Sequence, residues 1–196
     1  MRVPIVKGSD GIDGWKVKWW KGKADFEVVD TGIGKTIHLK SSSASTALYR
    51  EFKFDIKLYP VLRWKWKAVK LPKNGDVRRK ATDDQAIQIY VMFPRWPTAV
   101  RSRLVGYIWD SNAPAGGRFI SAKTSNTRYI VLRSGENGLG EWFSEERNVY
   151  EDYKELFKEE PPQAGGVSVM IDSDDTKGAA ESYIGDIVLT DGKNPD

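Results

Sequence analysis

Hydrophobic and polar residues alternate along most of the chain, as they do in half-buried β-strands. The alternating segments are rich in β-branched and aromatic residues, and Gly, Pro, Asn, Asp or Ser separates them. This pattern predicts strands at residues 24–29, 35–40, 47–56, 61–69, 85–93, 103–109, 127–133, 166–172 and 181–189. Short strands with polar turns, and no regular alternation with helices, favour an antiparallel β-sandwich or barrel.

One helix is predicted near residues 148–159. Asn148 and Glu151 have the spacing of a capping box, in which each side chain satisfies a backbone donor near the other. The apolar residues that follow lie on one stripe of a helix, and they are Val149, Tyr153, Leu156 and Phe157. Pro161 and Pro162 end the pattern. We expect this helix to cover an open end or an edge of the sandwich.

The composition excludes several kinds of chemistry. The chain of 196 residues has no cysteine and one histidine, His38, which lies in a predicted strand. Disulfides, thiolate zinc sites, cysteine nucleophiles and histidine pairs are therefore excluded. A net charge of +4, from 31 basic and 27 acidic residues, favours anionic partners without choosing among them. No apolar run reaches the roughly 20 residues of a membrane-spanning helix, so we expect no transmembrane segment.

Two segments, 15–21 and 62–67, interleave cations with aromatic residues, a pattern that single-stranded nucleic-acid binders also use. In an extended strand Trp64 and Trp66 share one face, so we interpret them as core residues. For Trp15, Trp19 and Trp20 the core and the ligand interpretation both stay open. A nucleic-acid partner would need a continuous basic stripe, and we do not expect one. Its members would be Arg63, Lys65, Lys67 and residues 78–80.

Acidic residues offer two further hypotheses. Asp172, Asp174 and Asp175 follow a predicted strand, and such a cluster can bind calcium or simply form polar turns. A pair of carboxylates could also hydrolyse a glycosidic bond. The spacing does not select two from the candidates, which are Asp83, Asp84, Glu141, Glu145, Glu146, Asp172 and Asp174.

A polar and aromatic sheet face is the strongest candidate for a ligand site. If the apolar rows of the strands face the core, alternation places Gln88, Tyr90, Arg133 and Asp172 on the opposite face. Burying Leu104 and Ile108 would likewise expose Tyr107 and Trp109. Aromatic rings that stack on sugar rings, beside planar polar groups that bond hydroxyls, suit a glycan. The alternative is that a loop or helix covers these side chains and they are structural.

Several motifs in order along the chain resemble one bacterial family. They are residues 62–67, Asp83-Asp84, 89–93, 106–109, 146–149, Asp152-Tyr153, Phe157, 169–176 and 183–187. Together they resemble the family catalogued as domain of unknown function 3047, from about Phe26 to Leu189. The family has no established activity, and its members are usually exported, which implies a periplasmic or secreted protein. An arginine commonly stands in the family where this chain has Gln88, which makes an anionic ligand less secure here.

The closing strand, with Asp186, also resembles the last strand of jelly-roll carbohydrate-binding modules. In those modules an acidic residue there often joins a structural calcium site. The resemblance therefore implies a calcium site formed by Asp172, Asp174 and Asp186, with no other cofactor expected.

We predict an all-β protein, an antiparallel β-sandwich of jelly-roll (galactose-binding-like) type that forms one domain over residues 1–196, with an ordered core of about 12–190. The predicted function is non-catalytic binding of a glycan, or of another anionic or polar component of the cell envelope. Tyr107 and Trp109 would stack on the ligand, and the remaining contacts would be Gln88, Tyr90, Arg133 and Asp172. The alternative is a glycan hydrolase or lyase with paired carboxylates in a cleft.

Overall fold

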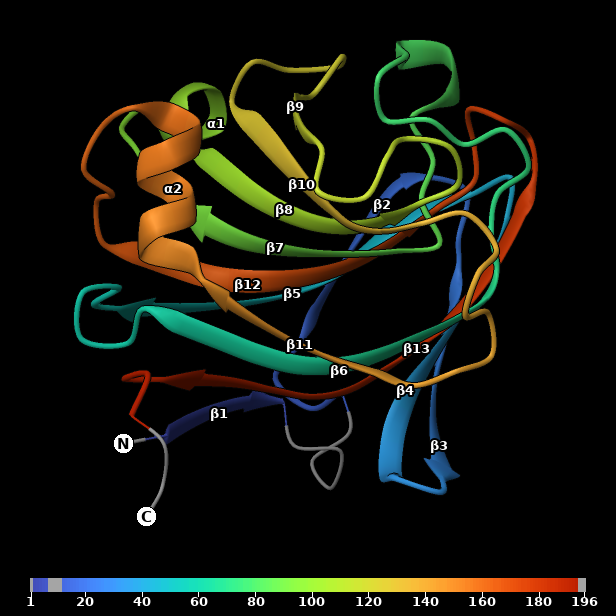
Figure 1. Cartoon of the computed structure of the whole chain (residues 1–196), viewed down its shortest axis with the longest axis horizontal. Coiled ribbons are helices and arrows are strands. Elements are labelled where there is room, and N and C mark those ends of the chain that lie inside the picture. The colour runs from blue at the N-terminus through green and yellow to red at the C-terminus, as the bar shows by residue number, and fades with distance from the viewer. Residues whose placement is uncertain (1, 7–11, 194–196) are drawn as a thin grey trace.

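The computed structural model describes residues 2–6 and 12–193 as two β-sheets packed face to face (Figure 1). The six-stranded sheet contains β1 (Arg2–Val6), β3 (Asp25–Thr31), β4 (Gly34–Ser42), β6 (Val61–Lys70), β11 (Phe143–Asn148) and β13 (Ala179–Thr190). The seven-stranded sheet contains β2 (Lys16–Lys21), β5 (Ser45–Phe54), β7 (Ile87–Phe93), β8 (Arg103–Asp110), β9 (Arg118–Ile120), β10 (Thr127–Ser134) and β12 (Ala164–Asp172). The helices are η2 (Lys80–Thr82), α1 (Thr98–Arg101) and α2 (Val149–Phe157).

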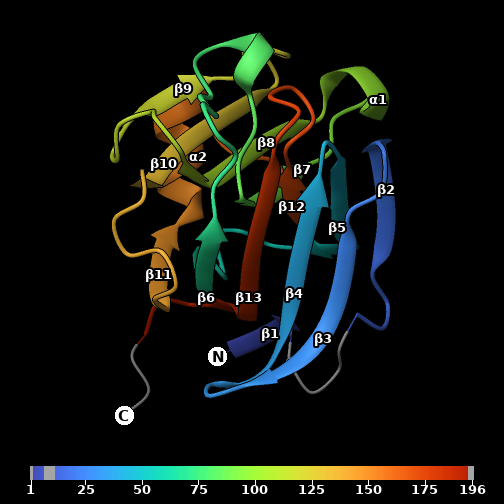
Figure 2. The same cartoon turned by 90° about the vertical axis from the view of Figure 1, so that its right-hand side faces the viewer.

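The strands are connected in the crossed order of a jelly roll. One sheet has the order β11-β6-β13-β4-β3, with β1 paired to β13, and the other has the order β2-β5-β12-β7-β8-β10-β9. Neighbours along the chain therefore often lie in different sheets, as Figure 2 shows for β4 and β5. β8 and β10 run parallel, whereas the other pairs are antiparallel.

The predicted β-sandwich is confirmed, and each predicted strand is present. The sequence pattern missed β1, β2, β9 and β11. β2 lies at a sheet edge and all six of its residues are exposed, so it has no buried face to produce alternation. β9 has only three residues, and β11, also an edge strand, contains one hydrophobic residue, Phe143, among polar and charged ones.

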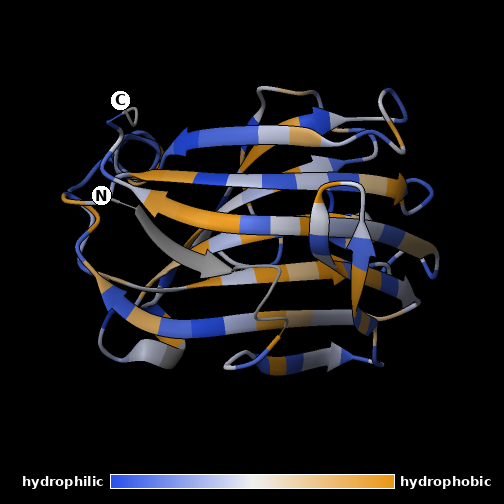
Figure 3. Ribbon diagram, turned by 90° about the horizontal axis from the view of Figure 1, so that it is seen from below, coloured by the Kyte–Doolittle hydropathy of each residue, from blue (hydrophilic) through white to orange (hydrophobic). Residues whose placement is uncertain are grey.

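Large aromatic side chains fill the space between the sheets. Trp64 and Trp66 of β6 are buried there, as predicted, and they contact Tyr107 and Trp109 of β8. The residues between them, such as Lys65, face outward and are exposed. Figure 3 shows the resulting alternation of hydrophobic and hydrophilic segments along the strands. The core is therefore held by cross-sheet packing of apolar rows, which carries most of the stability of such folds.

The helix α2 covers one end of the sandwich (Figure 1). The Asn148 side chain accepts a hydrogen bond from the backbone N–H of Glu151, at 3.1 Å, which confirms the Asn148 half of the predicted capping box. Val149 and Tyr153 are buried in the core. The helix ends at Phe157, because Lys158 adopts the left-handed conformation. Among the described residues, the helices are too short and too polar to cross a membrane.

A second, smaller apolar cluster lies on the outer face of the seven-stranded sheet. Tyr90, Ile108, Tyr129 and Val131 project from that face and pack under two loop residues, Val77 and Ala113. The loops therefore cover part of the sheet and leave the rest open. The boundary between the covered and the open part forms the candidate site.

Candidate ligand-binding groove

A groove of about 570 Å³ lies on the outer face of the seven-stranded sheet. Its floor comes from β5, β12 and β7, one wall from β2, and the other wall from residues of β8, β10 and the loop before β10. The residues of its lining that the argument uses are Lys18, Trp20, Lys21, Tyr49, Asp83, Gln85, Gln88, Tyr90, Met92, Leu104, Lys123, Tyr129, Met170, Asp172 and Asp174. We call this hollow the groove.

The groove contains Gln88, Tyr90 and Asp172, three of the predicted ligand residues. The Tyr90 hydroxyl donates to Gln88 Oε1. Both side chains are almost fully buried, as is Asp172. Their shared face was predicted correctly, and their role in binding stays a prediction.

A row of tyrosines crosses the middle of the groove. The strand register aligns Tyr49, Ser168, Tyr90, Gly106 and Tyr129 side by side on five neighbouring strands. Because successive residues alternate between the faces of a sheet, this whole row faces outward. The Tyr90 and Tyr129 hydroxyls lie 3.3 Å apart. Burial raises the pKa of both tyrosines above the ordinary value, so they are neutral hydroxyls at physiological pH.

Gly106 makes room for this row. A Cβ atom at Gly106 would lie 2.8 Å from Cε1 of Tyr90 and 2.9 Å from Cδ1 of Tyr129. We expect Gly106→Ala to push the two rings apart and to lower the free energy of unfolding by about 1–3 kcal/mol, measured by urea denaturation. Gly185→Ala is the matched control, since its Cβ would meet its nearest neighbours at an ordinary 3.5 Å. Equal effects of the two substitutions would contradict this account.

Acidic and amide groups gather at the end of the groove near η2. Gln85 Nε2 donates to Asp83 Oδ1 at 3.1 Å, and the Gln85 backbone oxygen accepts from the Asp172 N–H at 3.0 Å. Gln85 Oε1 is buried and has no hydrogen-bond partner. A buried acceptor without a partner costs free energy unless a ligand or water supplies the donor. Gln85 lines the groove but is fully buried, so a ligand with hydroxyl or amide hydrogens would satisfy this acceptor after a small side-chain movement.

Burial changes the protonation of these acids. Burial raises the pKa of Asp83 to about 6. Burial and the hydrogen bond to Asp174 raise the pKa of Asp172 well above its usual range, whereas hydrogen bonds from Asp172 and Lys21, against the effect of burial, lower that of Asp174. At neutral pH Asp172 is therefore a protonated acid that donates to the Asp174 carboxylate.

The raised pKa of Asp83 predicts how stability depends on pH. Since the folded state holds this proton more tightly than the unfolded state, Asp83 lowers the free energy of unfolding as pH rises from about 4 to about 6. Asparagine does not ionise, so Asp83→Asn does not lose stability in this way. Above pH 6 we expect the free energy of unfolding of the variant to exceed that of the natural protein by up to about 3 kcal/mol. Below pH 4 the difference disappears. Urea denaturation of both proteins at pH 4 and pH 7.5 measures it, and a difference independent of pH would contradict the burial of Asp83.

Two lysines neutralise the acidic cluster at this end. Lys21 Nζ lies 3.1 Å from Asp174 Oδ2, and Lys123 Nζ lies 2.5 Å from Asp175 Oδ2. A third lysine, Lys18, lies with its ammonium 4.9 Å from the centre of the Trp20 ring. The groove thus combines cations, acids and aromatic rings, with most acids paired inside the protein.

Trp20 is the functional candidate that the sequence left open. It lies on the edge strand β2 at the rim of the groove, and its side chain is 65% exposed. Trp20 lies two residues after Lys18 and shares its face by ordinary alternation, and the register shift between Trp19 and Lys21 brings Lys21 to the groove as well. Its neighbour Trp19 is 53% exposed, but it does not line the groove. The interleaved pattern of residues 15–21 was the available signal, but it could not show which of the indoles faces a ligand.

The predicted stacking residues Tyr107 and Trp109 face the other way, and this part of the prediction is wrong. Both are fully buried between the sheets. The Tyr107 hydroxyl donates to Asp152 of α2 at 2.8 Å, and Trp109 Nε1 donates to the Gly135 oxygen at 3.0 Å. The two pairs do lie on opposite faces of β8, as alternation predicts. However, Leu104 and Ile108 form the outer row, and loops cover part of this row in the second apolar cluster. An apolar row on both faces of β8 misled the assignment.

Arg133 is also remote from the groove. The register of β10 against β8 shifts between Val131 and Arg133, which turns Arg133 toward the inner side. Its guanidinium lies 3.3 Å from the centre of the Phe143 ring, and its Nε donates to Glu145 at 2.7 Å. The prediction that Arg133 shares a face with Gln88 is therefore wrong.

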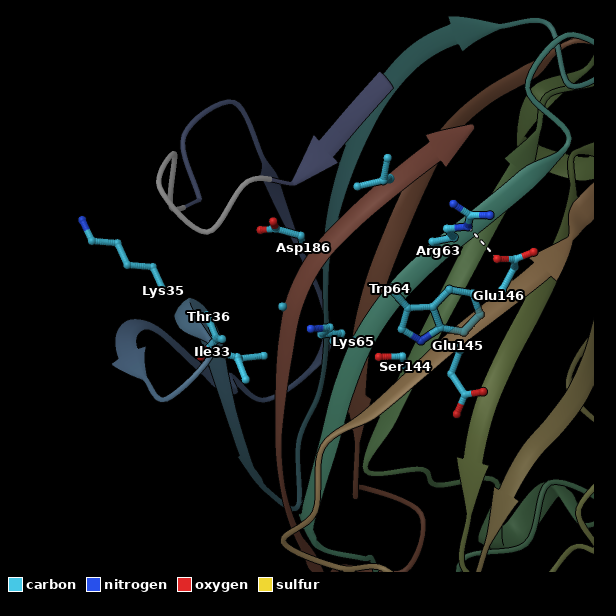
Figure 4. Close-up of a pocket in the computed structure, with 12 residues that line it drawn as sticks. Ile33, Lys35, Thr36, Arg63, Trp64, Lys65, Ser144, Glu145, Glu146 and Asp186 are labelled. Carbon is cyan, nitrogen blue, oxygen red and sulfur yellow. Dashed lines mark hydrogen bonds and ion pairs between the residues drawn. The ribbon is translucent and has the colours of Figure 1, made fainter. Parts of the chain in front are cut away.

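The three predicted calcium ligands do not come together. Asp172 and Asp174 line the groove, but Asp186 lines a different hollow of about 490 Å³ on the outer face of the six-stranded sheet (Figure 4). The β-bulge of β13 at residues 185–186 places Asp186 there. Figure 4 shows it beside Lys65 and opposite Thr36, with the Arg63–Glu146 ion pair at the far side.

A different set of acids could hold a metal ion. Oxygens of Asp84, Asp174 and Asp175 lie within 4.8 Å of one another. However, Asp84 accepts three hydrogen bonds, from the Asp175 and Thr176 backbones and the Thr176 hydroxyl. Lys21 and Lys123 pair with the other two acids, so two of the three carboxylates of this triad already have a cation.

The basic residues considered for nucleic acid do not form one stripe. Arg63 and Lys65 lie on the six-stranded sheet, where Arg63 pairs with Glu146 at 2.6 Å. Lys67 is held between Trp142 and Tyr183. Residues 78–80 lie beside η2 above the other sheet, and Arg78 pairs with Asp76 at 2.7 Å. These groups are thus separated, and Arg63 and Arg78 are paired with acids.

Comparisons with known proteins give a family and a fold. A family model described as "Protein of unknown function (DUF3047)" matches residues 13–188. None of the curated proteins matches the sequence. Among solved structures, the family 30 carbohydrate-binding module of a cellulosomal cellulase of Clostridium thermocellum aligns over 99% of both chains, with 12% identity and a TM-score of 0.56. The family 11 module of another cellulase from the same organism aligns over 95% of this chain and 92% of its own, with 8% identity and a TM-score of 0.52. At such identities the likeness shows the jelly-roll fold alone.

Proposed function

Since the chain belongs to the family of proteins of unknown function DUF3047, which has no activity to transfer, we propose from the groove that it binds a glycan without cleaving it. The fold that it shares with carbohydrate-binding modules supports this proposal. The observation that carries it is the position of Trp20, an exposed indole at the rim of a groove whose polar end holds the buried acceptor Gln85 Oε1.

The proposed contacts follow from the chemistry of sugars. The flat apolar face of a sugar ring would stack on Trp20, with Tyr49 beside it. Ring hydroxyls would donate to Gln85 Oε1, and Gln88, Tyr90 and Asp172 would orient the sugar from the floor. Asp172 is protonated, so it adds no negative charge that would repel an acidic glycan. The ammonium of Lys18 lies beside Trp20. The groove therefore suits a neutral glycan and also tolerates an acidic one.

The runner-up function is a glycan hydrolase or lyase. Asp83 and Asp172 line the same groove, and both have a raised pKa, as a general acid needs. Yet Asp83 accepts from Gln85, and Asp172 is hydrogen-bonded to Asp174, so each carboxyl already has a partner. This favours binding over catalysis. Release of new reducing ends or unsaturated sugars from a bound glycan, lost in Asp83→Asn, would establish the enzyme instead.

We propose no structural calcium at the predicted ligands, since Asp186 is remote and lysines pair with the remaining acids. We therefore expect the melting temperature to be unchanged by either EDTA or excess calcium, because an ion that binds only the folded state would raise it by mass action. A calcium-dependent rise that disappears in Asp84→Asn would contradict this and assign the ion to the triad of Asp84, Asp174 and Asp175.

The test of the proposed function is a binding screen against neutral and acidic glycans. Thermal shift detects ligands, and isothermal titration calorimetry then measures the dissociation constant of each hit. We expect at least one glycan to bind and its affinity to fall in Trp20→Ala. Failure of the whole panel to bind, or binding that ignores Trp20, would overturn the proposal.

A further inference from the structure

The lining of the groove changes from polar to apolar along the strands. At the end near η2 it contains Asp83, Gln85 and Asp172, and at the opposite end it contains Met92 and Leu104, with Thr127 beside Leu104. Figure 1 shows that this opposite end, where β7 finishes and β8 begins, lies next to α1. The two ends therefore offer different chemistry to one ligand.

The strand register places the apolar end at a definite distance. Gln88 and Met92 lie on the same face of β7, four residues or roughly 13 Å apart, with the tyrosine row between them. At the apolar end, Met92 is paired with Leu104 on one side and with Gly166 on the other, which adds no side chain. A sugar hydroxyl placed on these side chains would lose hydrogen bonds to water. A methylene group placed there gains from burial.

Exposed apolar residues lie around α1, near this end of the groove. The Leu104 N–H donates to the Asn126 oxygen at 3.0 Å, and the Asn126 amide donates to the Val100 oxygen at 2.6 Å, which fixes α1 beside Leu104. Around α1, Trp96 and Val100 are 84% and 69% exposed. Exposed apolar residues near a groove can extend its binding surface.

We propose that the ligand is an amphiphile, a sugar that carries an acyl or alkyl chain. The sugar lies beside Trp20 and the polar end, and the chain runs over Met92 and Leu104 toward α1. This inference rests on the proposed function, because it keeps the same groove and the same position for the sugar, and it adds the class of ligand.

Alkyl glucosides of increasing chain length test it. Calorimetry with methyl, butyl and octyl glucoside, below micelle-forming concentrations, compares ligands with one sugar and different chains. Each buried methylene should raise affinity by up to roughly fourfold, and partial burial of an octyl chain by about a hundredfold over methyl. We expect Met92→Gln to weaken octyl glucoside at least tenfold and to weaken methyl glucoside much less, because a methyl group does not reach Met92 from the polar end. Leu58→Gln is the control for adsorption, since Leu58 is an exposed leucine of the β5–β6 turn outside the groove lining.

The outcomes separate this inference from the proposed function. Suppose that panel glycans bind, but that octyl glucoside neither binds nor competes with them, or binds no more tightly than methyl glucoside. The proposal of an amphiphilic ligand is then wrong, and glycan binding stands. If octyl sulfate binds as tightly as octyl glucoside, the sugar is not recognised and the amphiphile is also wrong. If no panel glycan binds, the proposed function fails by its own test.

Discussion

Replacing Trp20 by alanine is expected to weaken glycan binding about thirtyfold, which corresponds to about 2 kcal/mol, while the free energy of unfolding changes by less than about 0.5 kcal/mol. The indole is mostly exposed on an edge strand, so the folded protein loses little packing without it. It is the one tryptophan among the described residues that line the groove. Calorimetry with the tightest glycan of the panel, and urea denaturation, measure the two effects.

Trp19→Ala is the matched control for this experiment. Trp19 is the same residue type on the same strand, is similarly exposed, and has its own lysine, Lys23, 5.2 Å from the ring centre. It does not line the groove. We expect its loss to leave affinity unchanged. If both variants weaken binding equally, the effect comes from the strand edge and the assignment of Trp20 is wrong.

Replacing Trp109 by alanine is expected to have the opposite effects to Trp20→Ala, namely a large loss of stability and nearly unchanged glycan binding. Trp109 is fully buried between the sheets against Trp66 and Phe143, and its indole N–H is bonded to Gly135. Removing it leaves a large cavity and an unpaired carbonyl oxygen, so we expect a loss of about 3–5 kcal/mol in the free energy of unfolding. Urea denaturation measures this loss.

Binding separates the two roles of these tryptophans. The fraction of Trp109→Ala that stays folded at low temperature should bind the glycan with nearly natural affinity, because the groove lies on the opposite face of the sheet. If Trp109→Ala had natural stability and did not bind the glycan, Trp109 would belong to the ligand site. The assignment of this face of β8 to the core would then be wrong.

The fold was predictable from the sequence because burial leaves a periodic signal. The row of Leu62, Trp64 and Trp66 and the cap at Asn148 each have one physical explanation, and the structure has both. Strand β2 has no buried face and left no such signal. Sheet pairing also depends on contacts between distant residues, which a local pattern does not contain.

The site was predictable only in part, for two physical reasons. Gln88, Tyr90 and Asp172 reach the groove because β7 and β12 follow strict alternation with one apolar row. β8 has apolar residues on both faces, so the sequence pattern does not show which face lies between the sheets. In the structure, loops cover Ile108 on the outer face. At Arg133 a β-bulge changes the direction of the side chain. Covering loops and bulges are tertiary features, so alternation cannot reveal them.

The most direct test of the groove uses the methionines as probes. The chain has three methionines, and two of them, Met92 and Met170, line the groove. The protein labelled with ¹³C at the methionine methyl groups would give few NMR signals, assigned from Met92→Leu and Met170→Leu. On titration with the tightest glycan of the panel, we predict that the signal of Met170, which is paired with Gln88, shifts along a saturation curve. Saturable binding that leaves the Met170 signal unmoved would place the glycan elsewhere and contradict the account.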